Sequence, residues 1–340
     1  MVDKNTGPII AVDAMGGDFA PDVPAKAALL ALAALPDLRV MLVGQAEKLR
    51  TLVQENNRLT IVAAADVITN NESPVMALRK KPDASLSVAL RLLREGKADA
   101  LVSAGSTGAV MAGSMFRLER AAGVERPALA VPIPTPDKPC LLLDAGANVD
   151  VTPDTLVSFA LMGHVYAKHV MGITSPRVAL VNIGEEAEKG NALTKEAHKL
   201  LSQSGRMLNF TGNIEARGVP LGEADVAVCD GFTGNILMKT MEGLSKALFG
   251  MIKSSLTASV KGKVAGLLAA DSFRKLKKEL SPDEIGGALM LGVSRPVVKA
   301  HGNSNENAYY NAIRQAYQSA RASVAGRIAQ ALTQTITAEQ

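Results

Sequence analysis

Residues 105–108, Gly-Ser-Thr-Gly, bring small side chains and hydroxyl groups to the point where an apolar, strand-like segment meets a segment with helical character. The first N–H groups of a helix have no partners within the helix and their dipoles are aligned, so this position suits an anion. Ser106 and Thr107 add hydroxyl donors, while Gly105 and Gly108 permit close approach or a positive φ. A tight turn with a Ser or Thr cap explains the same residues, and the loop alone leaves both interpretations open.

Polar turns of similar composition follow other apolar segments. They are DAMGGDFAP (13–21), DAGANVD (144–150), NIGEEAEKGN (182–191) and DGFTGN (230–235), and another polar turn is expected at 301–305. Ligands of doubly wound sheets bind beyond the carboxyl ends of the strands. We therefore expect the first four of these turns and the 103–109 turn to border one crevice.

The elements that position these turns follow from an alternation of patterns. Six apolar runs have the composition of buried strands: PIIAVDA, LRVMLVG, ADALVSA, PCLLLDAG, PRVALVNIG and ADVAVCDG. Helical patterns lie between them, including PDVPAKAALLALAALP, DASLSVALRLLREG and NALTKEAHKLLSQSG, the last with an Asn cap and an end at Gly205. The alternation predicts a three-layer α/β/α fold with a mainly parallel sheet. The C-terminal part indicates one more strand and a long closing helix, so that residues 1–335 form one catalytic unit or two subdomains with a shared cleft.

Residues 250–281 differ from the rest. From Lys253 to Lys278 the segment has seven Lys or Arg against one Asp, interleaved with apolar residues. This pattern predicts an inserted pair of amphipathic helical arms. Packing against the same chain or a dimer partner is the favoured explanation, and contact with anionic lipid is the alternative.

Composition narrows the function further. A chain of 340 residues with 47% hydrophobic residues can bury a large core, and the absence of Trp with few other aromatics argues against a nucleic-acid partner. A net charge of +4 allows an acidic partner, an anionic substrate or a lipid surface. Two unclustered cysteines, no signal peptide and no spanning segment indicate the cytosol.

Common cofactor and metal motifs are absent from the expected places. Neither G-x-G-x-x-G nor G-x-x-x-x-G-K-[ST] occurs at the strand-to-helix turns. Four strand-end aspartates are able to ligate a hard cation, namely Asp13, Asp18, Asp144 and Asp230. Because such residues often cap helices, we expect no metal and no bound cofactor. Cys229 is interpreted as a buried strand residue rather than a nucleophile.

Longer motifs closely resemble the bacterial phosphate acyltransferases of phospholipid synthesis, in unbroken order from residue 9 to residue 325. They are AVDAMGGDFAP, SAGSTGAVMAG, RPALAVPIPT, LLLDAGANVD, NIGEEAEKGNALTKEA, GNIEARG, DGFTGNILMKTMEG and KAHGNSNENAYYNAIRQA. The resemblance implies a fold similar to isopropylmalate dehydrogenase and phosphotransacetylase. It also implies transfer of a long fatty acyl group from an acyl-acyl-carrier-protein thioester to inorganic phosphate. The implied protein is a homodimer at the inner face of the cytoplasmic membrane, and its acyl phosphate passes to a membrane glycerol-phosphate acyltransferase.

In this chemistry phosphate is the nucleophile, so the protein has to hold two oxyanions, the phosphate and the developing oxygen of the thioester carbonyl. The resemblance assigns Gly105, Ser106, Thr107 and Gly108 to a phosphate cradle. Lys189 and Lys239 are candidate cations, although each is equally explained as a solvated lysine. His301 is a candidate proton donor to the leaving thiolate or the donor of a structural hydrogen bond.

The remaining candidates contact or orient substrate. Possible donors to the carbonyl or the phosphate are Asn148, Asn235 and Asn303. Orienting carboxylates are Asp18, Asp144, Asp230 and Glu185. The same turns contribute Asp13, Gly16, Gly17 and Thr233. Apolar contacts to the acyl chain or membrane are assigned to Val260, Val264, Leu267 and Leu268.

Three other functions remain open at this stage. A phosphotransacetylase would use short acyl-coenzyme A, and a decarboxylating dehydrogenase of similar fold would need NAD and a divalent metal. A non-catalytic scaffold would be recruited to the membrane through the basic arms.

Overall fold

The computed structural model describes residues 7–279 and 282–338. Parts of two expected ranges, 1–335 and 250–281, therefore lie outside the described residues. Within the described chain, eleven strands form one sheet in the spatial order β3-β2-β1-β4-β11-β10-β5-β6-β9-β7-β8. In chain order the strands are β1 (Ile9–Asp13), β2 (Arg39–Gly44), β3 (Leu59–Ala63), β4 (Ala100–Ser103), β5 (Ala128–Ile133), β6 (Cys140–Leu143), β7 (Arg177–Asn182), β8 (Asn209–Glu215), β9 (Val226–Val228), β10 (Gly287–Leu291) and β11 (Val297–Ala300).

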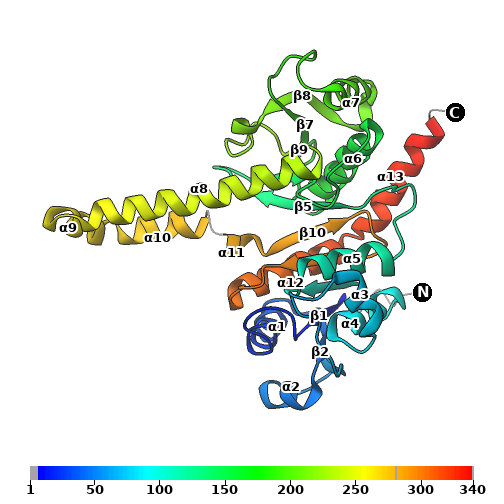
Figure 1. Ribbon diagram of the computed structural model, residues 1–340, viewed down its shortest axis with the longest axis vertical. Helices are drawn as coiled ribbons and strands as arrows, with labels where there is room; N and C mark the ends of the chain where they lie inside the picture. The colour runs from blue at the N-terminus through cyan, green and yellow to red at the C-terminus, as the bar shows by residue number, and fades with distance from the viewer. Residues whose placement is uncertain (1–6, 280–281, 339–340) are drawn as a thin grey trace.

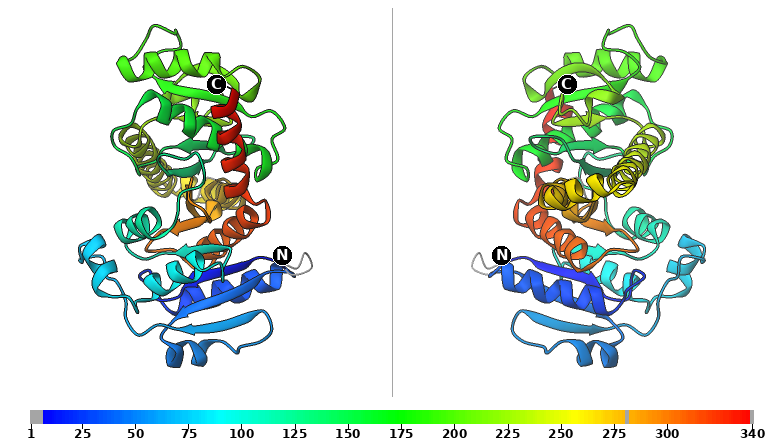
Figure 2. Two further views of the ribbon diagram at one scale, coloured as in Figure 1. Left: turned by 90° about the vertical axis from the view of Figure 1, so that its right-hand side faces the viewer. Right: turned by 90° about the vertical axis from the view of Figure 1, so that its left-hand side faces the viewer.

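The sheet has two parallel sections joined by an antiparallel centre. The first section is β3, β2, β1, β4 and β11, and the second is β6, β9, β7 and β8. Between them, β10 is antiparallel to β11 and β5, and β5 is antiparallel to β6. Figure 2 shows the blue N-terminal strands at one end, the green strands at the other and the orange C-terminal strands between them. The prediction of a single strand near the C-terminus is wrong, because the chain forms two antiparallel strands there, β10 and β11.

Helices cover both faces of the sheet (Figure 1). They are α1 (Asp22–Ala34), α2 (Ala46–Leu52), α3 (Pro74–Lys80), α4 (Ser85–Arg94), α5 (Thr107–Arg117), α6 (Pro153–His169), α7 (Ala192–Gln203), α8 (Gly231–Thr257), α9 (Val260–Leu268), α10 (Ala270–Glu279), α11 (Pro282–Ile285), α12 (Glu306–Arg321) and α13 (Val324–Ala338). The predicted Asn cap of α7 is confirmed, since Asn191 Oδ1 accepts the N–H of Thr194 at 2.9 Å.

One apolar cluster lies on each face of the sheet, between the strands and the helices. Two clusters are expected because successive side chains of a strand point to opposite faces. On β1, Ile10 and Val12 belong to the cluster on the face covered by α1, α6 and α12, whereas Ala11 belongs to the cluster on the other face, with residues of α3, α4 and α5. The predicted three-layer α/β/α class with a mainly parallel sheet is therefore confirmed.

The helices α8, α9 and α10 form an arm that projects away from the sheet (Figure 1). The 27 residues of α8 include only two buried ones, Gly231 and Gly234, both at its start. The arm overlaps the expected insertion at residues 250–281, but it begins earlier in the chain, because α8 starts at Gly231, shortly after β9. Among the described residues, no helix combines the length and the apolar character needed to cross a bilayer.

Candidate active site

Asp13 and Ser103 end the neighbouring strands β1 and β4, and their side chains meet. Ser103 Oγ donates to Asp13 Oδ2 at 2.6 Å, and the N–H of Gly105 donates to Ser103 Oγ at 3.1 Å. Both side chains are buried, and this burial raises the pKa of Asp13 above its ordinary value despite its hydrogen bonds. The turn that leads into α5 is therefore fastened to the end of β1.

The turn after β1 packs closely against this loop. A Cβ on Gly16 would lie 2.6 Å from the nitrogen of Gly105, and Gly17 has a φ of +101°, which favours glycine. The N–H of Asp18 donates to the carbonyl of Gly302 at 2.7 Å. The structure thus brings together the turns that follow β1, β4 and β11.

The N-terminus of α5 lacks a side-chain cap. Ser106 occupies the N-cap position without accepting an N–H group through its side chain, and in the described chain the N–H groups of Thr107 and Gly108 have no hydrogen-bond partner. A capping side-chain oxygen is present at the start of α6, α7, α8 and α12, whereas α1 to α4 lack one as α5 does. The open N–H groups and the adjacent hydroxyls can hold an anion the size of phosphate.

Lys299 lies beside this group and was missed by the sequence analysis. In the parallel register Ser103 pairs with Asp13 on one side and with Lys299 on the other. The residues two positions earlier in these strands are Ala11, Leu101 and Val297. All three belong to the apolar cluster on the sheet face that α4 and α5 cover. Because side chains alternate, the row of Asp13, Ser103 and Lys299 faces the same way. Burial lowers the pKa of Lys299 to about 8, against the opposing effects of Asp13 and Asp18.

A buried carboxylate also organises the second parallel section. Asp144, at the end of β6, accepts the backbone N–H groups of Leu129, Gly146, Ala147 and Asn148 at 2.7–3.1 Å. The amide nitrogen of Asn148 donates to Asp144 Oδ2 at 2.9 Å and to Pro127 O at 2.8 Å. Both donors of this amide are therefore engaged within the protein, which suits an orienting role. Burial raises the pKa of Asp144 despite its many donors.

The start of α8 is attached to the same loop. Asp230 caps the helix by accepting the N–H and the hydroxyl of Thr233, each at 2.8 Å, and the N–H of Gly231 donates to Asn148 O at 2.7 Å. A Cβ on Gly146 would lie 3.4 Å from Cβ of Asn235, so Asn235 lies directly over the Asp144 loop.

A contact between α8 and the turn after β11 links the two parallel sections of the sheet. Asn235, Lys239 and Glu242 are spaced at i, i+4 and i+7 and share one side of α8. Glu242 Oε1 lies 3.9 Å from Nε2 of His301, the residue directly after β11. This side of α8 therefore approaches the turn after β11.

Three candidates have exposed side chains that form no hydrogen bond or ion pair with these groups in the described residues. Lys189, Glu185 and Asn303 are exposed, and within the described structure no hydrogen bond or ion pair of their side chains joins them to the other candidates. The backbone of Lys189 is nevertheless fixed, because its carbonyl accepts Nδ2 of Asn182 at 3.1 Å.

The arm exposes apolar side chains along two stripes with the same i, i+4, i+7, i+8 spacing. On α8 they are Leu244, Leu248, Met251 and Ile252, and on α9 they are Val260, Val264, Leu267 and Leu268. The α9 stripe is the more exposed, with 79% of Leu267 and 83% of Leu268 accessible to solvent.

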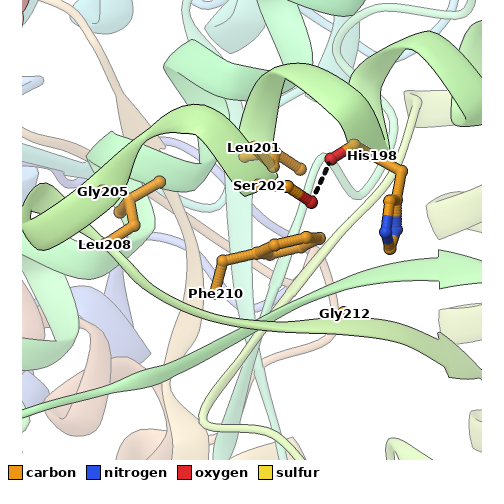
Figure 3. Close-up of a pocket in the computed structure, with 7 residues that line it drawn as sticks. All are labelled: His198, Leu201, Ser202, Gly205, Leu208, Phe210 and Gly212. Atoms are coloured by element: carbon orange, nitrogen blue, oxygen red, sulfur yellow. Dashed lines mark hydrogen bonds between the residues drawn. The ribbon is translucent and has the colours of Figure 1, made fainter. Parts of the chain in front are cut away.

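A hollow of about 280 Å³ lies elsewhere, between α7 and β8 at the outer edge of the second section. Figure 3 shows the residues that line it: His198, Leu201, Ser202, Gly205, Leu208, Phe210 and Gly212. The His198 ring packs edge-on against Phe210, with ring centroids 5.3 Å apart. None of the candidate residues lines this hollow, so it is separate from the strand-end turns.

The cysteines are poorly suited to nucleophilic catalysis. Burial raises the pKa of Cys140 to about 12. The pKa of Cys229 is raised well above its ordinary value by burial, with Asp230 and Asp144 adding to the effect. Among the described residues, no group of three or more His, Cys, Asp or Glu side chains is placed to hold a metal ion.

The sheet and its two helical layers define a three-layer α/β/α protein whose fold is like that of the phosphotransacetylases. The phosphotransacetylase of Streptococcus pyogenes superimposes with a TM-score of 0.63 at 17% identity, over 92% of this chain and 94% of the other. A phosphotransacetylase of Staphylococcus aureus gives a TM-score of 0.59 at 17% identity, over 93% and 94%. At these identities the likeness shows the fold.

The family follows from the sequence comparisons. A family model described as fatty acid synthesis protein matches residues 9–327. The phosphate acyltransferase of Lysinibacillus sphaericus is 47% identical over 308 residues, covering 90% of this chain and 93% of the relative. That of Geobacillus thermodenitrificans is 46% identical over 327 residues, covering 96% and 99%. The chain belongs to the phosphate acyltransferase family and is a transferase, which confirms the resemblance found in the sequence.

The Asp144 loop yields a prediction about stability. Asp144→Ala removes the acceptor of several buried N–H groups and should lower the free energy of unfolding by about 3 kcal/mol in equilibrium urea unfolding. Asp150→Ala, at an exposed position in the same turn, is the matched control and should change it by less than about 0.5 kcal/mol. Equal effects of the two substitutions would contradict the organising role of Asp144.

Proposed function

We propose that the protein transfers a long-chain fatty acyl group from an acyl-carrier-protein thioester to inorganic phosphate, as a step of phospholipid synthesis. Phosphate itself attacks the thioester carbonyl. The observation that carries the proposal is the uncapped N-terminus of α5, which has open N–H groups in a family whose curated members are named phosphate acyltransferases. Inorganic phosphate is an anion that such a helix start suits.

In the proposed reaction, the N–H groups of Thr107 and Gly108 and the hydroxyls of Ser106 and Thr107 hold hydrogen phosphate, with Gly105 giving the ligand close access. A phosphate oxygen forms a bond to the carbonyl carbon, and the bond from carbon to sulfur breaks. The proton of hydrogen phosphate ends on the thiolate of the carrier protein, which leaves as a thiol. No side chain has to form a covalent bond with the acyl group.

Candidates for the second oxyanion lie on α8. Asn235 and Lys239 share the side of α8 that approaches His301 through Glu242. Asn235 is a donor for the developing carbonyl oxygen, a role worth about 3 kcal/mol for one well-placed group. Lys239 and Lys189 supply positive charge, and His301 is the candidate donor for the leaving thiolate, with the proton of hydrogen phosphate replacing the one that His301 gives up. Asn303 is a further candidate donor.

The acidic residues at the strand ends are proposed to position these donors. Asp13 and Asp144 are buried acceptors of hydrogen bonds, and Asp230 caps α8. Asp18 is proposed to hold the turn after β11, and Glu185 to orient the loop of Lys189. Because hydrogen phosphate is already an anion near neutral pH, none of them is needed as a base.

The arm is proposed to serve the acyl chain and the membrane. Its α9 stripe lies on a segment with exposed lysines, including Lys261 and Lys263, a combination that suits an anionic lipid surface. The α8 stripe is proposed to pack against a second copy in a homodimer. The protein would then act at the inner face of the cytoplasmic membrane and deliver acyl phosphate to a membrane glycerol-phosphate acyltransferase.

The function is tested by incubating purified protein with palmitoyl-acyl-carrier protein, with and without inorganic phosphate, and trapping acyl phosphate as a hydroxamate. We expect phosphate-dependent hydroxamate from this donor and none from acetyl-coenzyme A. Product from acetyl-coenzyme A alone would identify a short-chain phosphotransacetylase. No phosphate-dependent product from either donor, together with vesicle binding, would indicate a scaffold.

The cradle predicts a phosphate-specific defect in Thr107→Val. This substitution removes a hydroxyl from the helix start while keeping the shape of the side chain. The loss of one hydrogen bond to a charged ligand should lower kcat/KM for phosphate by about tenfold or more. Thr107→Ser keeps the hydroxyl and is the control, with kinetics close to those of the original protein. Unchanged kinetics of the Val variant at limiting phosphate would remove Thr107 from the cradle.

The arm predicts lipid binding through α9. Leu267→Glu with Leu268→Glu places two charges on the most exposed apolar positions and should abolish co-sedimentation with anionic vesicles. The matched control is Leu29→Glu with Leu30→Glu, an adjacent and partly exposed pair on α1, which should leave binding intact. Persistent binding of the α9 variant would assign its stripe to protein packing.

A further inference from the structure

Lys299 is a charged residue in an otherwise apolar strand. Its neighbours on β11, Val297, Val298 and Ala300, are all buried, and the strand lies between β4 and β10 inside the sheet. Taking an ammonium group partly out of water costs free energy unless hydrogen bonds and an opposite charge compensate it. The position of Lys299 therefore calls for a partner.

The protein itself supplies little of this compensation. Lys299 Nζ donates to the carbonyl of Ala300, and an ammonium group has three N–H donors. Asp13 and Asp18 both favour the charged form of Lys299, but the hydrogen-bond donors of Asp13 are Ser103, Ser85 and the backbone N–H groups of Met15 and Gly16. Within the described chain, no carboxylate forms an ion pair with Lys299. Donor capacity is left for a ligand.

The direction of the side chain indicates where that ligand lies. Lys299 is on the sheet face that α5 covers, one strand from Ser103, and the chain passes from Ser103 through Gly105 into the open end of α5 within four residues. Adjacent strands are about 4.8 Å apart. An extended lysine side chain is longer than this spacing, which allows the ammonium group to turn toward the start of α5.

We propose that Lys299 is a phosphate-binding residue, whose ammonium group is the fixed counter-ion of the phosphate held at the N-terminus of α5. The inference rests on the proposed function and deepens it by naming the cation of the phosphate site. Lys189 and Lys239 are exposed, on a loop and on a helix surface, whereas Lys299 is held by a central strand. A cation placed in advance stabilises the bound anion without having to be ordered when the ligand arrives.

The experiment measures phosphate binding by the rise of the unfolding temperature as inorganic phosphate is titrated at constant ionic strength, alongside steady-state kinetics. Lys299→Met keeps a long apolar stem and removes the charge. We expect the half-saturating phosphate concentration and KM for phosphate to rise about tenfold or more, with a smaller effect on kcat at saturating phosphate. Lys299→Arg should recover a large part of the affinity, and Lys48→Met, at an exposed position on α2, should behave as the original protein. A phosphate titration of Lys299→Met that matches the original protein would overturn the proposal.

Two further comparisons test the proposal if the first variant fails or if the original protein shows no acyl transfer. If Lys299→Met does not fold, Asp13→Asn is compared with the double variant Asp13→Asn/Lys299→Met, which loses both charges of the row. Phosphate affinity should fall further in the double variant, and equal affinity in the two would overturn the role of Lys299. The binding titration needs no acyl donor. Lys299-dependent phosphate binding without acyl transfer by the original protein would contradict the proposed function and leave this inference standing.

Discussion

The unpaired N–H groups at the start of α5 are the constraint on which the rest of the site depends. Helix starts leave backbone donors that need partners, and α6, α7, α8 and α12 receive a side-chain cap, whereas α1 to α4 do not. At α5 the cap is missing, and the strand ends beneath it present Asp13, Ser103 and Lys299 in one row. An anion bound there gains hydrogen bonds, the helix dipole and a nearby cation together.

The buried carboxylates make sense as the supports of such backbone donors. Asp13 fastens the turn before α5 through Ser103, and Asp144 gathers the N–H groups of its own loop beneath the start of α8. Rigid loops of this kind offer donors that need not rearrange when charge develops, which is the main requirement for stabilising an oxyanion. The raised pKa of Cys229 fits the same account, because a reaction in which phosphate attacks needs no activated thiol.

Local patterns in the sequence were sufficient for much of the fold. The helical spacing of apolar residues, together with capping residues and glycines, identified α1, α4 and α7. The continuous apolar runs corresponded to buried parallel strands such as β1 and β7. Apart from the second strand of the C-terminal pair, three strands escaped because each departs from that pattern. β5 contains Pro132, β8 (NFTGNIE) is a largely polar edge strand, and β3 lies at the opposite edge with partly exposed residues. The antiparallel centre was also invisible, since strand direction depends on how distant segments pair.

The site was predictable where it lies in turns and unpredictable where it depends on register. Glycines and hydroxyl residues marked the turns before α5 and α8, but the contact of Glu242 with His301 joins residues that no local pattern relates. Lys299 was overlooked because it stands within a strand, before the polar turn. The detectable signal was a lysine among apolar residues in VVKA, and its importance emerges only from its alignment with Ser103 and Asp13.

The central claim is that phosphate, and no amino-acid side chain, attacks the acyl thioester. Intact-protein mass spectrometry tests it most directly, on enzyme mixed with stoichiometric palmitoyl-acyl-carrier protein in the absence of phosphate and quenched in acid over successive times. The account predicts that the enzyme keeps its unmodified mass and that the carrier protein stays acylated until phosphate is added. A palmitoyl mass increment on the enzyme, formed before phosphate and discharged by it, would contradict the account.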